Sequence, residues 1–354
     1  MSAPRMPVFD GHNDFLLRLQ RAPQRREEIW LHGEGLGHLD LPRMKRGGFA
    51  GGMFAIYVPS PQLDGPVDRG MDNPPYDVPL PAMLDQTMAL AYATSMAGHL
   101  MWMERASAGA LRIVRTATGI EEAMRDGAIA AVMHMEGAEA IGTDLDALHA
   151  FHAMGLRSLG PVWSRPTAFG HGVPFRFPSG PDTGDGLTDA GKRLIRECNA
   201  LKIMADLSHL NEKGFDDVAA ITDAPLVATH SNAHAVTPSA RNLTDRQLAV
   251  IRETQGMVGL NFATCFLRDD GRRAPEIGWE PVLRHMDHLI ATLGEDHVGF
   301  GSDFDGATVP EGIGDVTGLP ALLGALRAHG YDDTLLEKLA WRNWIGVLRR
   351  TWGE

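Results

Sequence analysis

VFDGHND, at residues 8–14, is the stretch around which the rest of the chain is organised. Val8 and Phe9 are apolar and indicate the end of a buried strand. His12 and Asp14 follow, and on an extended backbone residues two positions apart point to the same face. An imidazole and a carboxylate side by side suit a divalent metal such as zinc. Alone, the pair is more typical of a polar turn, so its meaning depends on the rest of the chain.

The composition is that of a globular protein with a full core. The chain has 354 residues, of which 44% are hydrophobic and 22% charged,. A net charge of −12 makes nucleic acid or an anionic membrane a poor partner. Two cysteines, Cys198 and Cys265, provide no disulfide framework. We find no apolar run typical of a signal peptide or a membrane span, so we expect a cytoplasmic protein, for which a homodimer is possible.

Short apolar segments alternate with amphipathic helices along the whole chain. We expect strands at residues 8–9, 49–58, 129–135, 156–163, 203–207, 226–229, 257–262 and 298–301. Continuous apolar strands are typical of a parallel sheet. Unbroken alternation of strand and helix favours one α/β domain, a (β/α)₈ TIM barrel over residues 1–354, rather than two domains.

Two long loops and a helical C-terminus complete this predicted domain. The loops at residues 59–81 and 164–187 are rich in proline or glycine and show no periodicity. Loops of such length in a compact domain are often functional, and we expect both to lie over the active-site face. Additional helices are predicted at residues 319–328, 333–339 and 341–352.

Polar side chains follow five of the predicted strands. They are His12, Asp14, Glu136, His209, His230 and Asp303. In a barrel the C-terminal ends of the strands meet on one face, where active sites lie, so we expect these side chains to converge. They exceed what one tetrahedral zinc needs, which favours two metals about 3.5–4 Å apart with a polarised water between them as nucleophile. Glu136 is the natural bridge, because a carboxylate has two oxygens.

Five segments, spread in order over nearly the whole chain, carry a family resemblance. They are DGHND at 10–14, MEG at 135–137, DLSH at 206–209, THSNAHAVTPSARN at 229–242 and GFGSDFDG at 299–306. These segments resemble the membrane (renal) dipeptidase family, peptidase family M19. The resemblance implies a barrel of the amidohydrolase type with a binuclear zinc site that cleaves dipeptides.

The resemblance also implies individual roles for the polar residues. One zinc ion takes His12, Asp14 and Glu136, and the other takes Glu136, His209 and His230. Arg241 holds the C-terminal carboxylate of the dipeptide, for which its planar guanidinium is well suited. Asp303 passes the proton of the attacking water to the leaving amine, which is ordinary general acid–base chemistry for a carboxylate.

One position departs from the family pattern. The family has a histidine after its fourth strand, where it polarises the substrate carbonyl, and this chain has Trp163. We expect Trp163 to form an aromatic wall of the pocket. We expect His171, flanked by the flexible Gly170 and Gly172,, to reach over it to the carbonyl oxygen. The alternative is an exposed His171, with the metals alone polarising the carbonyl.

Three functions are compatible with these residues. A metallodipeptidase is favoured. The second is a related hydrolase acting on a lactone, an N-acyl amino acid or a phosphoester, which the presence of Trp163 keeps open. The third is a non-catalytic barrel that binds metal or a partner, and the full set of ligands together with Asp303 speaks against it.

Overall fold

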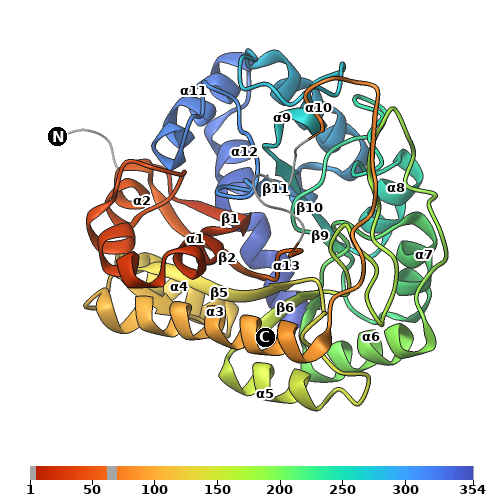
Figure 1. Ribbon diagram of the computed structural model, residues 1–354. Coiled ribbons are helices and arrows are strands. Elements are labelled where there is room, and N and C mark those ends of the chain that lie inside the picture. The colour runs from red at the N-terminus through yellow and green to blue at the C-terminus, as the bar shows by residue number, and fades with distance from the viewer. Residues whose placement is uncertain (1–4, 62–69, 354) are drawn as a thin grey trace.

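Eight parallel strands form a nearly closed barrel in the computed structural model, which describes residues 5–61 and 70–353 (Figure 1). They are β1 (Val8–Asn13), β2 (Phe49–Tyr57), β5 (Ile129–Glu136), β6 (Leu156–Gly160), β8 (Met204–Ala205), β9 (Val227–Ala228), β10 (Met257–Asn261) and β11 (Val298–Gly301). Each strand pairs with the next in this order, and β11 returns to β1. A single bridge between Asp206 and Val227 joins β8 to β9. The predicted (β/α)₈ barrel is therefore confirmed.

Helices pack around the barrel, on its sides and at its ends (Figure 1). They are α1 (Phe15–Arg21), α2 (Leu41–Gly47), α3 (Gln86–Ala106), α4 (Ala117–Arg125), α5 (Asp146–Met154), α6 (Asp189–Leu201), α7 (Glu212–Ile221), α8 (Asp245–Glu253), α9 (Thr264–Leu267), α10 (Glu280–Leu293), α11 (Leu319–His329), α12 (Asp333–Glu337) and α13 (Asn343–Trp352). Thr188 and Thr244 accept a backbone N–H at the starts of α6 and α8, as N-caps do,. No helix within the described ranges combines the length and the apolar character that crossing a bilayer requires.

Helix α13 closes the end of the barrel that lies opposite the C-terminal ends of the strands. Its Trp344 is fully buried and donates a hydrogen bond from Nε1 to the carbonyl oxygen of Phe300, at 2.9 Å. A Cβ atom added at Gly11 or Gly299 would overlap the Trp344 ring, so only glycine lets this ring come so close to β1 and β11. The tryptophan thereby plugs one end and leaves the other for the site.

The loops and strand ends differ in detail from the prediction. The loops predicted to lack regular structure contain β3 (Tyr76–Val78) and β7 (Phe175–Phe177), which pair antiparallel. Residues 62–69 of the first loop lie outside the described ranges. A further strand, β4 (Leu111–Ile113), pairs with β5 and was not predicted. Three residues are too few for a period of two to be recognised. The fourth barrel strand ends at Gly160 rather than at 163, because Pro161 has no N–H for the ladder,.

Candidate active site

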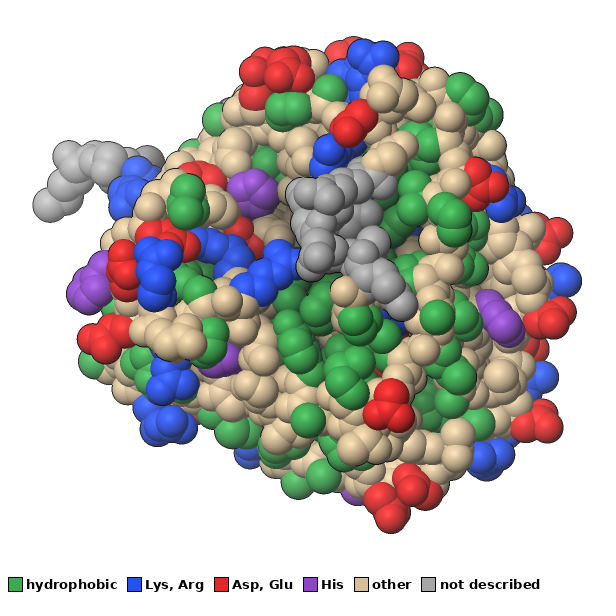
Figure 2. Space-filling view, viewed as in Figure 1, with side chains coloured by type: hydrophobic (Ala, Val, Ile, Leu, Met, Phe, Trp, Pro, Cys, Tyr) green, Lys and Arg blue, Asp and Glu red, His purple; other side chains and the backbone are tan. Residues whose placement is uncertain are grey.

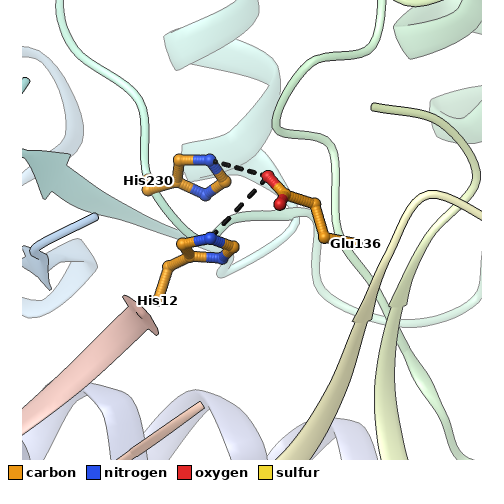
Figure 3. A group of neighbouring side chains, drawn as sticks. All are labelled: His12, Glu136 and His230. Atoms are coloured by element: carbon orange, nitrogen blue, oxygen red, sulfur yellow. Dashed lines mark ion pairs between the residues drawn. The ribbon is translucent and has the colours of Figure 1, made fainter. Parts of the chain in front are cut away.

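The five predicted metal ligands converge at the C-terminal ends of the barrel strands. His12 lies in β1 and Glu136 is the last residue of β5, while Asp14, His209 and His230 follow strands β1, β8 and β9. One carboxylate oxygen, Oε1 of Glu136, lies 3.0 Å from Nε2 of His209, 3.4 Å from Nε2 of His230 and 3.7 Å from Nε2 of His12. Figure 3 shows two of these imidazoles facing Glu136. Nε2 of His12 also lies 3.4 Å from Oδ2 of Asp14. All five side chains are buried.

The hydrogen bonds around the imidazoles leave ring nitrogens free for a metal. His230 Nδ1 lies 2.8 Å from Oγ1 of Thr229, and this hydroxyl donates to Asp206 at 2.6 Å. The imidazole must therefore be the donor at Nδ1, which leaves the lone pair of Nε2 facing Glu136. Nδ1 of His209 lies 2.8 Å from Oγ of Ser164. Nε2 of His12 is buried and makes no hydrogen bond.

The charge balance of the cluster also fits bound cations. Burial lowers the pKa of the His12 imidazole and holds the pKa of His209 and His230 well below the ordinary value, so these rings are neutral. Burial, reinforced by the neighbouring carboxylates, raises the pKa of Asp14 to about 7 and that of Glu136 well above its ordinary value. Buried carboxylates are costly unless cations compensate them. His12, Glu136 and His230 offer three ligand atoms within 4.8 Å of one another, and so do His12, Asp14 and Asp303.

Asp303 lies at the edge of this cluster, next to His12 and Asp14. Its Oδ2 accepts a hydrogen bond from Nδ2 of Asn261 at 3.0 Å. The side chain is partly exposed to the cavity, and burial raises its pKa to about 6. A carboxylate held in place with a pKa near neutrality is able to accept and return a proton.

A cavity of about 500 Å³ opens above the cluster. Asp14, Glu136, His209 and Asp303 contribute polar groups to its lining. Its apolar wall includes Tyr57, Met71, Trp163, Phe175 and Phe266, and its basic residues are Arg18, Arg21 and Arg273. Figure 2 shows hydrophobic and basic side chains gathered around the middle of this face. The volume and the mixed lining suit a small polar ligand.

Two of the predicted substrate-binding residues, Trp163 and Arg241, lie near the metal ligands. The Trp163 ring lies 5.2 Å from that of Tyr57 and 5.5 Å from that of Phe175, and together they form the aromatic wall that was expected. Arg241 is buried beside the cluster. Its guanidinium donates to the carbonyl oxygen of His230 at 3.0 Å and stacks 5.4 Å from the ring centre of Phe266. Burial lowers the pKa of the Arg241 guanidinium, whereas the negative charges of Asp303 and Glu136 raise it.

His171 is not brought to the cavity, and its predicted reach over Trp163 is corrected. It lines a separate surface hollow with Asp77 and Arg176. Its carbonyl oxygen accepts a hydrogen bond from the backbone N–H of Asn211, at 3.3 Å. A Cβ atom at Gly172 would overlap the carbonyl oxygen of Trp163. The glycine beside His171 therefore permits close packing of the loop, not the freedom to swing inward.

Tyr57 is one of the cavity residues that the sequence analysis missed. It is the last residue of β2, and its register partner in β5 is Glu136. The available signal was its place at the end of an apolar segment, the same place that identified the ligands. A tyrosine there is more often a core residue, which is why it was not singled out.

Comparisons with known proteins agree with this geometry. The family model for membrane dipeptidase, peptidase family M19, matches residues 3–352. The crystal structure of a metallo peptidase from Rhodobacter sphaeroides, liganded with a phosphinate mimic of the dipeptide L-Ala-D-Ala, is 70% identical, covers 99% of this chain and 100% of that chain, and has a TM-score of 0.97. The structure of dipeptidase AC, a metallo peptidase of family M19, is 69% identical with the same coverage and a TM-score of 0.95. A Klebsiella pneumoniae relative, an uncharacterized protein in the pqqA 5′ region, is 52% identical over 70% of this chain and 92% of its own length.

Proposed function

The chain belongs to the membrane dipeptidase family, peptidase family M19, and is a metal-dependent dipeptidase; from this premise we propose that it works with two zinc ions bridged by Glu136. The observation that carries the proposal is the single oxygen of Glu136 that faces three neutral imidazoles. His12 and Asp14 would complete one ion, and His209 and His230 the other. Bound zinc supplies Lewis acidity toward the scissile carbonyl and lowers the pKa of water.

The residues around the ligands hold them in the orientation that binding requires. The pair Thr229–Asp206 fixes the tautomer of His230, and Ser164 holds the His209 ring by a hydrogen bond at Nδ1,. Because these partners are buried, the ligand lone pairs are already directed before a cation arrives. This arrangement lowers the reorganisation that binding demands.

Asp303 is proposed as the proton-transferring residue. Asn261 holds its carboxylate, and a pKa of about 6 lets it take a proton from the attacking water at neutral pH. The same proton then passes to the amine nitrogen as the peptide bond breaks, so the leaving group departs neutral. Trp163 and Phe175 shield this exchange from bulk water on one side of the cavity,.

Arg241 is proposed to bind the free carboxylate of the dipeptide. Its Nε is buried without a hydrogen-bond partner among the described residues. A guanidinium offers a planar fork for a carboxylate, and such a contact selects substrates that end one residue after the scissile bond. The stacking on Phe266 fixes the plane of this fork.

The substrate class is proposed to include dipeptides with a small first residue and a D-residue second. The support is the Rhodobacter sphaeroides metallo peptidase, 70% identical, which binds a phosphinate mimic of L-Ala-D-Ala. A tetrahedral phosphinate resembles the transition state of peptide hydrolysis, and such mimics bind more tightly than substrates do. Among the described residues that line the cavity, none specifically favours a lactone or a phosphoester.

A substrate panel tests this proposal. The zinc-loaded protein should hydrolyse L-Ala-D-Ala and L-Ala-L-Ala, and should leave N-acetyl-alanine, a lactone and a phosphoester largely intact. Amidated L-Ala-D-Ala should be a poor substrate, because it lacks the charge that Arg241 is proposed to bind. Rapid turnover of the lactone or the phosphoester with no turnover of any dipeptide would refute the proposal and support the alternative hydrolase.

A further inference from the structure

Tyr57 is the register neighbour of the metal ligand Glu136 and lines the cavity. Tyr57 ends β2 and Glu136 ends β5, and the two are direct partners in the parallel register. Paired residues of neighbouring strands project to the same face of a sheet. The phenol and the carboxylate therefore leave the barrel together, and both line the cavity with Asp14 and Trp163.

The Tyr57 hydroxyl is a buried polar group. Tyr57 is 2% exposed, and its oxygen has no hydrogen-bond partner among the described residues. A buried polar group without a partner carries an uncompensated desolvation cost, so a native protein that keeps one needs a reason. Burial raises the pKa of this phenol well above its ordinary value of 10.0, so the group remains a neutral hydrogen-bond donor.

The donor is also held in place. The Tyr57 ring packs against Trp163, with the ring planes 60° apart. Behind Trp163, the buried guanidinium of Arg165 donates to Ser60 Oγ at 2.7 Å and to the carbonyl oxygen of Val58 at 2.9 Å. These bonds anchor the chain directly after Tyr57. A fixed donor stabilises a developing charge without reorganising during the reaction.

Two of the three arginines that line the cavity are engaged in ion pairs. Arg18 donates to Asp305 and Glu34, and Arg273 forms an ion pair with Asp72. Nε2 of His209 faces Glu136. The tryptophan that replaces the family histidine cannot carry a proton charge, and His171 lies in a separate hollow. The Tyr57 hydroxyl, which has no partner among the described residues, is thus available to assist the metals at the carbonyl oxygen of the substrate.

We propose that the Tyr57 hydroxyl donates a hydrogen bond to the scissile carbonyl oxygen of the dipeptide and holds it more strongly as that oxygen becomes negative. The inference rests on the proposed dipeptidase function and assigns a catalytic residue within it. The proton stays on the phenol throughout, so no covalent step or additional reactant is involved. The hydroxyl has no hydrogen-bond partner among the described residues of the free enzyme and gains one in the transition state. An interaction that is strongest in the transition state raises kcat.

Tyr57→Phe is the direct test, since it removes the hydroxyl and keeps the ring. We expect kcat for L-Ala-D-Ala to fall by about 10²–10³, the usual effect of losing one such donor, with KM and zinc content little changed. The affinity for the phosphinate mimic of L-Ala-D-Ala, measured by calorimetry, should weaken by the same factor as kcat/KM. The Tm of the free variant should equal or exceed that of wild type, because an unpaired buried hydroxyl is lost.

Tyr331→Phe is the matched control. Its hydroxyl donates to Asp287 at 2.7 Å, away from the cavity, so kcat and phosphinate affinity should stay at the wild-type values. An unchanged kcat in Tyr57→Phe would overturn the proposal, and so would loss of zinc or a lower Tm, since either would mean that the hydroxyl serves the ligands or the fold. A wild-type protein that hydrolyses no dipeptide would instead refute the proposed function, whatever the variant does.

Discussion

Replacing Arg165 with methionine should destabilise the protein strongly and loosen the wall of the active site. The side chain is fully buried. Its Nε and one terminal nitrogen donate to Oε1 of Glu139 at 3.0 and 2.6 Å, and its other contacts reach Ser60 and Val58. It thus ties together the loops that follow β2, β5 and β6. The guanidinium also lies 5.4 Å from the ring centre of Trp163.

The size of the loss in stability follows from the unpaired carboxylate that the substitution leaves. Glu139 is almost completely buried, with 1% of its side chain exposed, and loses its counter-ion. Breaking a buried pair by removing one partner costs about 3–5 kcal/mol. With about 2.1 cal/mol/K of unfolding entropy per residue over 354 residues, this corresponds to a fall in Tm of about 4–7 °C.

Calorimetric unfolding of zinc-loaded protein measures the effect. Arg112→Met is the control, because the ion pair between Arg112 and Asp126 is exposed and such pairs contribute about 0–1 kcal/mol. The double variant Arg165→Met, Glu139→Gln should recover part of the lost stability, since no buried charge remains unpaired. If Arg165→Met unfolds at the same temperature as Arg112→Met, the ion pair does not anchor the loops.

Three further predictions concern the ligands, the substrate and the response to acid. Glu136→Gln should lose most of its zinc by elemental analysis and nearly all activity, and a variant that retains both would exclude the bridge. Arg241→Met should cost about 2–5 kcal/mol in kcat/KM, as truncating one partner of a buried charge pair does; steady-state kinetics should show that the variant no longer distinguishes the free dipeptide from its amide, and undiminished discrimination would exclude Arg241 as the anchor. Burial, with smaller contributions from Arg284 and His288, lowers the pKa of His285 from 6.5 to about 3. Between pH 3 and pH 6.5 the His285 imidazole is therefore protonated in the unfolded chain but neutral in the folded protein. The free energy of unfolding is unaffected by this histidine above pH 6.5, and it falls by up to about 1.4 kcal/mol per pH unit as the pH drops toward 3,. Denaturant unfolding of His285→Gln should show a flatter acid limb, and an identical limb would contradict this assignment.

The metal ligands could be predicted because barrel geometry decides where strand ends lie. Once Val8–Phe9 and the other apolar segments were taken as parallel strands, residues directly after them had to share one face. No contact between His12 and His230 needed to be known in advance. The observed convergence of three imidazoles on Glu136 depends on the direction of the strands and on the two-residue alternation of side chains along them. Both can be recognised from short segments of the sequence.

The groups that support the ligands could not be predicted in this way. The hydrogen bond between Ser164 and His209 spans 45 residues and depends on how a loop after β6 folds. The position of Tyr57 beside Glu136 depends on register, which apolar runs do not specify. The prediction for His171 was wrong because its flanking glycines were taken as a sign of mobility. In the structure, Gly172 packs closely on Trp163 and holds the loop away from the cavity.

Titration of metal-free protein with zinc tests the central claim most directly. The protein is stripped with a chelator, and hydrolysis of L-Ala-D-Ala is followed as zinc is added in measured equivalents. The bridged site predicts no activity in the stripped protein and a rise that reaches its plateau at two zinc ions per chain. A plateau at one ion, or full activity in the stripped protein, would contradict it.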